Sequence, residues 1–519
     1  GVAFSTGTAG LTDLLESPAG AGNGADVLAY LRGDRSHESK TPALRTRSHL
    51  LGAIVHSEPV LAREPDHAYT DDGYSAFVAA KNNRQRMLYV GANDGMLHAF
   101  NADNGEEEWA YVPRGALSKL GALASPTWSY EATVDGYLTV ADVDFGNTFR
   151  NSGSADWRTI LVGGLGRGGK SFFALDVTDP IPAGENAQAK QTSLPDKVLW
   201  EFPNDSTGAS DKANMGLAFS RPIIVKHEIT ATDGTKSGKG WVVLVSSGYN
   251  NGSGDGEGYL YVLDAMTGEV IRAISTGEGS ASDPSGLGQL SAWVENDNFD
   301  SSVTWVYGGD LKGNLWRFDL TAAEPSAWSV TKLATLGQPI TSAPELTRIK
   351  SGSVSYNLVA VGTGRYLGES DIPATGSTPP TQSFYVIADS IGSSNFTPIT
   401  RNDLTPRTLT SLSGGKRGLT STTPIAWNKT KGWFVDFNIS GERVNTDPAI
   451  ALTTLVFVTN VPSADPCVPG GSSHLFQFDL VTGAYAHGIE QVSESLGNAL
   501  SNRPVLIKLP NGKIVALIR

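Results

Sequence analysis

The chain has 519 residues, with 18% charged and 39% hydrophobic side chains, 59 glycines and 27 prolines, which indicates a folded, turn-rich protein and not a disordered one. Its net charge is −13 and no run of lysine or arginine exceeds two, which excludes the basic stripe of a nucleic-acid-binding protein. No apolar run approaches the about 18 residues of a membrane-spanning helix, so we expect no transmembrane segment.

The first 50 residues are predicted to form a short, partly helical segment that packs on the domain that follows it, over residues 51–519. Apolar side chains have helical spacing at residues 11–15 and 26–31. The chain opens on GVAFSTGTAG without a signal peptide, which we interpret as the start of a fragment from a longer precursor whose N-terminal remainder is missing.

A repeated unit follows this segment. Its first copy, at residues 86–113, reads RMLYVGANDGMLHAFNADNGEEEWAYVP. An apolar run, a glycine turn and a second apolar run that ends near Asp or Asn predict a meander of short antiparallel strands. Further copies lie at residues 158–180, 241–274, 303–320, 356–389 and 455–483. Repeats of this kind, with four strands per unit, are typical of a β-propeller.

Proline-marked strand starts keep the same phase as the repeats. Proline at the first residue of a strand removes no hydrogen bond from the sheet. Together with SGL at residues 285–287, these starts predict an all-β, seven-bladed propeller over residues 51–519, with irregular loop insertions. Little chain follows the last start, so the last blade is expected to be incomplete or closed by a terminal segment. The starts lie at Pro59, Pro126, Pro222, Pro344, Pro424 and Pro504.

Several long motifs, in a fixed order, resemble the C-terminal domain of the type IV pilus tip adhesin and biogenesis proteins, the PilY/PilC family. They are YLRGDRS, LGAIVHSEPV, YVGANDGMLHAFNADNGEEEWAYVP, LVGGLGRGGKSFFALDVTDP, VYGGDLKGNLWRFDL and VGTGRYL. The resemblance implies a modified, quinoprotein-like propeller at the pilus tip, outer membrane or cell surface. It also implies a role in pilus extension, twitching motility and adhesion, through contacts with pilins or minor pilins and with host or abiotic surfaces.

Oxygen-bearing side chains alternate directly before the copy at residues 303–320. Calcium takes six to eight oxygen ligands, several of them from carboxylates. The resemblance implies that the family binds calcium at this loop, with the seventh position contributing its backbone carbonyl. Only one of the five side chains is a carboxylate, so we expect either weak binding, near about 10⁻³ M, or a polar hairpin without the ion. The five residues are Asn296, Asn298, Asp300, Ser302 and Thr304.

Three smaller features have simpler alternatives. In the sequence NGSGDGE, polar side chains also alternate, which fits a second calcium loop or, more simply, a solvated glycine-rich turn. The tripeptide Arg32-Gly33-Asp34 matches an integrin-binding motif, but we expect it to form the end of a helix or strand, with Arg32 paired to a carboxylate. The only cysteine, Cys467, permits no disulfide within the chain, and the sequence is compatible with either a free thiol or a partner outside the chain. The alternating residues of the glycine-rich sequence are Asn251, Ser253, Asp255 and Glu257.

The repeats could alternatively belong to an enzyme. The run from Ala99 to Trp109 resembles the repeat of pyrroloquinoline quinone dehydrogenases, where it has a packing role. A single cysteine excludes their vicinal disulfide, and GLGRGGK at residues 164–170 is not a P-loop. The sequence has no HExxH and no Gly-x-Ser-x-Gly motif. We therefore expect no enzyme, and keep a quinoprotein-like dehydrogenase and a plain scaffold propeller as alternatives.

Overall fold

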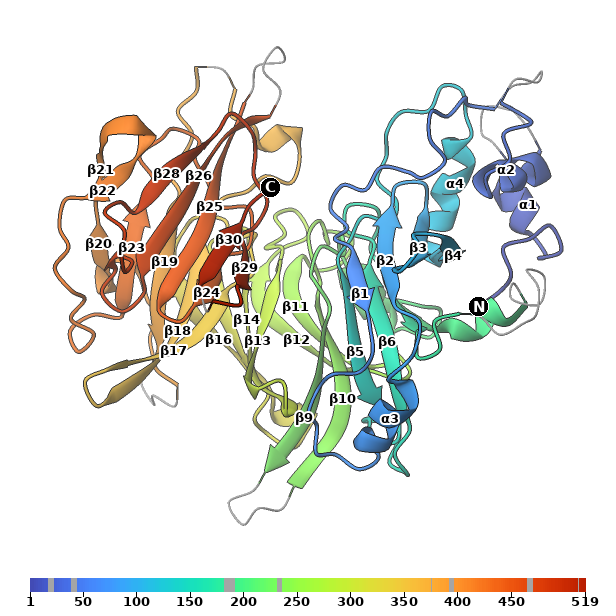
Figure 1. Cartoon of the computed structure of the whole chain (residues 1–519), viewed down its shortest axis with the longest axis horizontal. Helices are drawn as coiled ribbons and strands as arrows, with labels where there is room; N and C mark the ends of the chain where they lie inside the picture. The colour runs from blue at the N-terminus through green and yellow to red at the C-terminus, as the bar shows by residue number, and fades with distance from the viewer. Residues whose placement is uncertain are drawn as a thin grey trace. The chain divides into compact units, whose positions relative to one another are not determined.

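The computed structural model describes residues 1–16, 23–38, 44–181, 192–230, 236–374, 376–391, 396–463, 470–511 and 513–519 (Figure 1). Its internal contacts divide the chain into two compact units. Unit 1 comprises Gly1–Pro284, Val294–Thr304 and Leu320–Trp328, and unit 2 comprises Ser285–Trp293, Trp305–Asp319 and Ser329–Arg519. Strands dominate both units, which confirms the all-β prediction.

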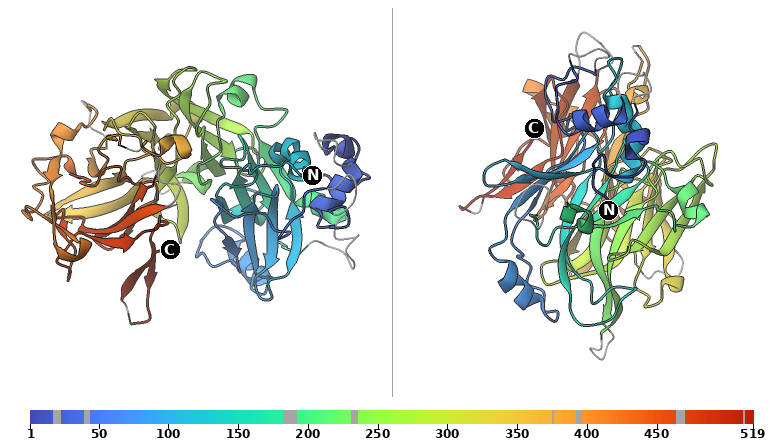
Figure 2. Two further views of the ribbon diagram at one scale, coloured as in Figure 1. Left: turned by 90° about the horizontal axis from the view of Figure 1, so that it is seen from above. Right: turned by 90° about the vertical axis from the view of Figure 1, so that its right-hand side faces the viewer.

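Unit 1 contains three four-stranded meanders in which each strand pairs antiparallel with the next. The strands of both units can be followed in two further views (Figure 2). The first meander is β1 (Val60–Ala62), β2 (Met87–Ala92), β3 (Met96–Asn101) and β4 (Glu107–Tyr111). The second is β5 (Leu138–Asp144), β6 (Trp157–Gly164), β7 (Phe172–Asp176) and β8 (Val198–Phe202). The third is β9 (Ile223–Thr230), β10 (Lys236–Ser246), β11 (Glu257–Asp264) and β12 (Val270–Gly279).

Two strands run across the boundary between the units along the chain. They are β13 (Leu290–Asn296) and β14 (Asp300–Gly309), which pair with each other. The first residues of β14 belong to unit 1, where Ser302 pairs in parallel with Lys226 of β9. The rest of β14 continues in unit 2 and pairs with β15 (Asn314–Asp319), which pairs with β16 (Ser329–Thr335).

Unit 2 continues with two larger sheets and a final hairpin. One sheet contains β17 (Glu345–Ser351), β18 (Val354–Gly362), β19 (Ser383–Asp389), β20 (Thr405–Arg407) and β23 (Gly432–Asp436). The other contains β21 (Leu409–Ser411), β22 (Arg417–Leu419), β24 (Ala449–Ala451), β25 (Thr454–Pro462), β26 (Gly471–Asp479), β27 (Ala484–Tyr485) and β28 (Ser493–Gly497). The hairpin is β29 (Val505–Lys508) and β30 (Ile514–Leu517). Because this last pair falls short of a four-stranded blade, the count of seven blades stays a prediction.

Short helices occur in unit 1 both where the sequence predicts them and elsewhere. Helices α1 (Leu11–Leu14) and α2 (Gly24–Leu31) match the predicted ones. Helices α3 (Tyr74–Lys81), α4 (Leu117–Leu123) and α6 (Ala209–Asn214) were not predicted, because one or two turns in a loop give little periodic signal. Leu11, Val27 and Leu120 belong to one buried cluster, so α1 and α2 pack against α4. The proposed division at residue 50 stays a prediction.

Four of the predicted proline starts are confirmed, because Pro59, Pro222, Pro344 and Pro504 directly precede β1, β9, β17 and β29. Two are wrong. No strand begins after Pro126 or Pro424, and the next new meander starts are β5 at Leu138 and β24 at Ala449. Proline requires a φ near about −65° and a position where no backbone N–H has to donate a hydrogen bond. An irregular loop offers such positions as readily as the start of a strand does. The proline that precedes β24 is Pro448.

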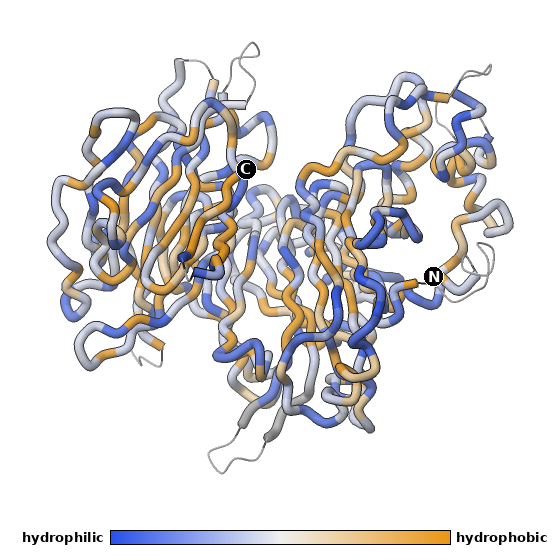
Figure 3. The backbone as a smooth tube through the Cα atoms, viewed as in Figure 1, coloured by the Kyte–Doolittle hydropathy of each residue, from blue (hydrophilic) through white to orange (hydrophobic). Residues whose placement is uncertain are grey.

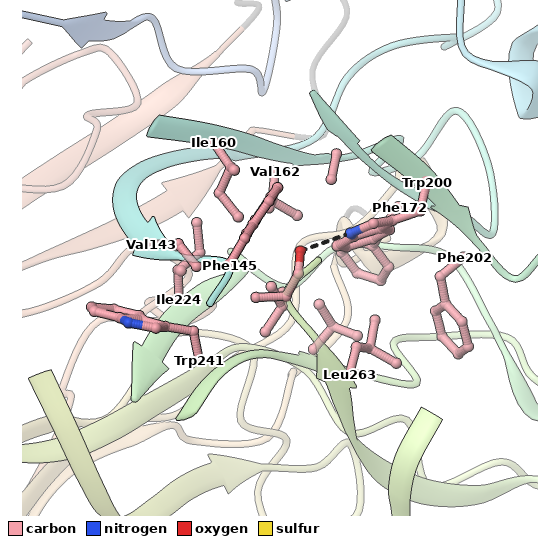
Figure 4. Packing of buried hydrophobic residues seen from close by; sticks show 14 of the residues in the cluster. Val143, Phe145, Ile160, Val162, Phe172, Trp200, Phe202, Ile224, Trp241 and Leu263 are labelled. Atoms are coloured by element: carbon pink, nitrogen blue, oxygen red, sulfur yellow. Dashed lines mark hydrogen bonds between the residues drawn. The ribbon is translucent and has the colours of Figure 1, made fainter. Parts of the chain in front are cut away.

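The core of unit 1 lies between its meanders. Val162, Trp241 and Leu263 belong to one cluster of almost fully buried side chains from different meanders (Figure 4). The indole of Trp200 donates to the carbonyl of Ala265 at 3.0 Å, so strand β8 is tied to the turn after β11. Hydrophobic residues gather along the central strands, whereas many connecting loops are hydrophilic (Figure 3). This pattern explains why the first run of each repeat is nearly all apolar.

Candidate functional site

The predicted calcium loop forms the turn between β13 and β14, which we call the β13–β14 hairpin. Strand β13 ends at Asn296 and β14 begins at Asp300. Asn296 and Asn298 are exposed, whereas Asp300, Ser302 and Thr304 are partly buried along β14. The hydroxyl of Ser302 donates to Asp300 Oδ1 at 2.7 Å. The structure thus brings Asp300 and Ser302 together and places the two asparagines at the surface.

Asp297, between the two asparagines, is bonded within the turn itself. The hydroxyl of Ser301 donates to Asp297 Oδ1 at 2.7 Å. Ser301 also shares a hydrogen bond of 2.8 Å with the hydroxyl of Tyr69, which is buried. Asp297 therefore helps to hold the hairpin turn, and its carboxylate is directed to the turn itself.

A buried ammonium group faces Asp300. The side chain of Lys226, on β9, is only 1% exposed. Its Nζ lies 2.8 Å from Asp71 Oδ1, 2.9 Å from Glu228 Oε2 and 3.3 Å from Asp300 Oδ1. We call these four residues the lysine cluster. A lysine ammonium has three N–H donors, and three carboxylates surround this one, so each donor has an acceptor within reach.

Three chain segments position the lysine cluster. Lys226 and Glu228 lie two residues apart on β9, so their side chains leave the same face of the strand. The parallel pairing of Lys226 with Ser302 sets β14, and hence Asp300, beside β9. The third segment precedes α3 and carries Asp71.

The segment before α3 is tied directly to the hairpin. The backbone N–H of Ala68 donates to the carbonyl of Asn298 at 2.8 Å, and Tyr69 bonds to Ser301 as described above. The ring of Tyr69 stacks on Trp157, with centroids 5.9 Å apart, within the core of unit 1. These contacts fix where Asp71 can reach Lys226.

The environment keeps Lys226 charged. Burial on its own lowers the pKa of the ammonium, but hydrogen bonds to Asp71 and Glu228, together with their negative charges, outweigh burial and raise the pKa above its ordinary value. The lysine cluster therefore already contains a permanent cation at neutral pH.

A calcium ion does not fit in the lysine cluster in addition to the ammonium. A calcium ion bound to Asp300 would lie beside the Lys226 ammonium, and two cations at such a distance repel each other. Within the described ranges, no group of three or more His, Cys, Asp or Glu side chains is arranged to hold a metal ion. The calcium site at Asn296, Asn298, Asp300, Ser302 and Thr304 stays a prediction.

Sequence reasoning missed Lys226, Glu228 and Asp71. A signal for the first two was present, because IIVKHE places two opposite charges on one face of an otherwise apolar strand start. Asp71 carried no such signal. It lies 155 residues from Lys226 along the chain, and only the folded structure brings the two together.

The second predicted calcium loop is a hydrogen-bonded turn. Asn251 is fully buried and donates to the carbonyls of Asn214 and Glu257, at 3.1 and 2.7 Å. The Asp255 carboxylate accepts from the amide of Asn214 at 3.1 Å and from the hydroxyl of Tyr259 at 2.5 Å. Ser253 donates to the carbonyl of Ala213 at 2.8 Å. These side chains are engaged by the protein itself, so the turn is held more firmly than a solvated loop.

The Arg32-Gly33-Asp34 tripeptide ends helix α2, as expected, with Arg32 as its C-terminal cap. The guanidinium of Arg32 donates to the carbonyl of Phe4 at 2.8 Å, and not to a carboxylate. Gly33 has a φ of +104°, a conformation that favours glycine. Cys467 lies outside the described residues.

A groove of about 1460 Å³ also lies within unit 1. Residues from the N-terminal segment, the end of α2, strands β3 and β4, and the chain around β8 line it. His98 on its wall is bound on both ring nitrogens, with Nδ1 2.6 Å from Glu107 Oε1 and Nε2 3.1 Å from Asp94 Oδ1. Burial lowers the pKa of His98, but these two carboxylates outweigh burial and raise it to about 9.

Replacing His98 by glutamine is expected to remove a pH-dependent part of the stability. Because the folded pKa of about 9 exceeds the unfolded value of 6.5, the bound proton stabilises the fold fully below pH 6.5, and this stabilisation is lost as the pH rises through 9. We expect a loss of about 2 kcal/mol at pH 6, less than the full linkage value because Glu107 is half exposed. Urea unfolding at pH 6 and at high pH measures it.

The control for this experiment is His487→Gln, because His487 is exposed. This variant should unfold like the wild type at both pH values. An equal loss for His98→Gln at both pH values would contradict the assignment of a bound proton and indicate a packing effect alone.

Antiparallel meanders whose second strands, such as β2, β6 and β25, are apolar and largely buried, with turns such as Gly309-Asp310, define a β-propeller type of domain. A family model described as the PilY1 beta-propeller domain matches residues 51–411, which is more than half of the chain. The chain therefore belongs to the PilY1 β-propeller family.

Curated relatives extend this similarity over most of the chain. A type IV pilus biogenesis factor PilY1 homolog from Xylella fastidiosa is 31% identical over 515 residues, covering 89% of this chain and 31% of the relative. The type IV pilus biogenesis factor PilY1 of Pseudomonas aeruginosa strain PAK is 31% identical over 517 residues, covering 89% of this chain and 40% of the relative. The chain thus spans less than half the length of these relatives.

A solved structure agrees with the family assignment. The crystal structure of the Pseudomonas aeruginosa PilY1 C-terminal domain superimposes with a TM-score of 0.66 at 25% identity, covering 88% of this chain and 97% of that one. Among the described residues, no helix is both long and apolar enough to cross a membrane.

Proposed function

We propose that this domain acts in type IV pilus biogenesis, as a non-enzymatic factor that supports pilus extension, twitching motility and surface attachment. The observation that carries the proposal is the 31% identity over 89% of the chain to proteins named type IV pilus biogenesis factors. The proposed partners are pilins or minor pilins and host or abiotic surfaces. The proposed location is outside the inner membrane, at the pilus tip, the outer membrane or the cell surface.

The dehydrogenase-like run favours a packing role over an enzymatic one. Trp109, at its end, is 5% exposed, and its indole donates to the carbonyl of Pro180 at 2.8 Å. Pro180 follows β7, so this bond ties the first meander of unit 1 to the second. A tryptophan committed to such a bond supports the scaffold role of the repeat and lends no support to a quinone site.

We further propose that the strand groups make seven blades. Meanders open at β1, β5, β9, β13, β17, β24 and β29, which is one opening per proposed blade. The last of them has only β29 and β30. Leu506, Ala516 and Ile518 pack on the buried residues of β25 and β26, which supports their role as part of a terminal blade.

The pilus assignment predicts the phenotype of a deletion. A strain whose gene lacks the segment for residues 51–519 should lose most of its surface pili and its twitching zone, because the domain is proposed to support pilus extension. Electron microscopy of pili and a twitching assay on agar measure both. Complementation with the intact gene should restore them.

Two results would contradict the assignment. Wild-type piliation and twitching in the deletion strain would exclude a role in pilus extension. Quinone-dependent alcohol oxidation by the purified protein would favour the dehydrogenase alternative. If the domain is only a scaffold, the deletion strain should retain its pili and the purified domain should capture no pilins in a pull-down.

A further inference from the structure

The lysine cluster links three segments of unit 1 through one cation. Asp71 precedes α3, Glu228 and Lys226 lie on β9, and Asp300 begins β14. We propose that the Lys226 ammonium takes the place that a calcium ion would have at the β13–β14 hairpin, so that this domain fixes the hairpin without calcium. The proposal concerns only the cation at this hairpin and does not depend on the pilus function.

The geometry around Nζ is that of a filled cation site. Calcium binds carboxylate oxygens at about 2.3–2.6 Å, and the ammonium holds three of them slightly farther away, at 2.8, 2.9 and 3.3 Å. A metal ion and an ammonium therefore serve the same purpose here, because each draws carboxylates from separate segments to one point. Lys226 does so as part of the chain and cannot dissociate.

The charges of the hairpin agree with this assignment. Asp300 is the only carboxylate among the five alternating residues, and it already contacts Lys226. The exposed Asn296 and Asn298 offer only neutral oxygens, which do not offset two further positive charges beside an ammonium. Removing the ammonium reverses the balance, because Asp71, Glu228 and Asp300 would then lose the cation that they share.

The proposal predicts the outcome of calcium titration. The melting temperature of the wild-type protein should be the same, within about 1 °C, in millimolar calcium and in chelator, since no ion is bound only by the folded state. Lys226→Met retains most of the apolar stem and removes the charge. This variant should melt about 5 °C below the wild type in chelator, because three neighbouring carboxylates then lose the cation that they share.

Calcium should restore part of the stability that Lys226→Met loses. Once the ammonium is removed, Asp71, Glu228 and Asp300 can rearrange to approach one calcium ion, and binding in the range of about 10⁻⁴–10⁻³ M is expected for such a partly exposed site. Differential scanning fluorimetry from chelator to 10 mM calcium, about ten times the upper end of that range, measures the recovery. Lys350→Met is the matched control, because Lys350 is exposed on β17 and its loss should create no calcium response.

Two results would overturn the proposal. The first is a calcium-dependent rise in the melting temperature of the wild type that Asp300→Asn abolishes, because calcium would then bind beside Lys226. The second is a Lys226→Met variant whose melting temperature does not respond to calcium any more than that of Lys350→Met. The wild-type arm keeps the proposal testable even if Lys226→Met yields no folded protein.

Discussion

Replacing Asp310 by alanine is expected to destabilise unit 2 by about 4 kcal/mol, because the carboxylate of this fully buried residue accepts four hydrogen bonds. Its Oδ1 accepts from the backbone N–H groups of Lys312 and Asn314, at 2.9 and 2.8 Å. Its Oδ2 accepts from the Asn314 amide and the Trp316 indole, both at 2.9 Å. Alanine removes the acceptor of all four hydrogen bonds, three of which are buried.

The Asp310 experiment needs a graded variant and a control. Asp310→Asn retains the shape but presents only one oxygen, so it should lose about half as much stability. Asp13→Ala removes an exposed carboxylate from α1 and should change stability by less than about 0.5 kcal/mol. Urea unfolding, followed by circular dichroism and tryptophan fluorescence, compares the three. A loss below about 1 kcal/mol for the alanine variant would mean that the carboxylate does not hold the turn.

The sequence predicted this turn because its signal is local. The run from Val303 to Leu320 becomes β14 and β15, and Tyr307 pairs with Arg317 in the register that the Gly-Asp and Gly-Asn turns require. Gly313 has a φ of +81°, which suits the second turn. Apolar runs such as residues 242–245 are fully buried, so a continuous hydrophobic pattern was a direct signal of a central strand.

The lysine cluster could not be predicted in the same way. Its contacts join residues that are far apart in the chain, and no periodicity within one segment records them. The alternating loop suggested ligands on one side, and in the structure Asp300 and Ser302 do meet. What the sequence could not show is that a lysine from another strand would contact Asp300, at 3.3 Å. Such a contact changes the cation that we infer at the hairpin without changing the loop's pattern.

The strand starts at Pro126 and Pro424 failed for a related reason. Proline reports only that a residue has a fixed φ and no N–H donor. Whether a sheet neighbour follows depends on distant strands. The strands that follow Pro59 and Pro222 do have such neighbours, because β1 pairs with β2 and β9 pairs with β10.

Unit 2 also contains a buried ion pair, formed by Arg417 and Glu442. The guanidinium of Arg417, on β22, binds both oxygens of Glu442, at 2.7 and 2.8 Å, and the two side chains are 5% and 0% exposed. Arg417 also donates to Ser493 at 2.9 Å, and Thr459 donates to Glu442 at 2.5 Å. The pair therefore connects β22 with β25 and β28 of the same sheet.

Arg417→Met is expected to destabilise unit 2 by about 3–5 kcal/mol, because the buried Glu442 carboxylate loses its guanidinium partner and retains only His474, at 3.9 Å, whose pKa burial lowers. The guanidinium lies over the ring of Phe476, 4.5 Å from the ring centroid, and methionine replaces this cation–π contact with a thioether of similar length that can pack on the ring. The loss should thus report the missing charge more than lost packing. Urea unfolding midpoints of the variant and the wild type, measured at neutral pH, give the difference.

The double variant Arg417→Met/Glu442→Leu separates the two explanations of that loss. If the cost comes from an unpaired buried charge, removing the carboxylate as well should restore most of the stability, to within about 2 kcal/mol of the wild type. If instead the pair is itself a strong net attraction, the double variant should be as unstable as Arg417→Met. Recovery would mean that the pair's main effect is to fix how β22, β25 and β28 meet, since each strand must then present its polar group to one shared, water-free point.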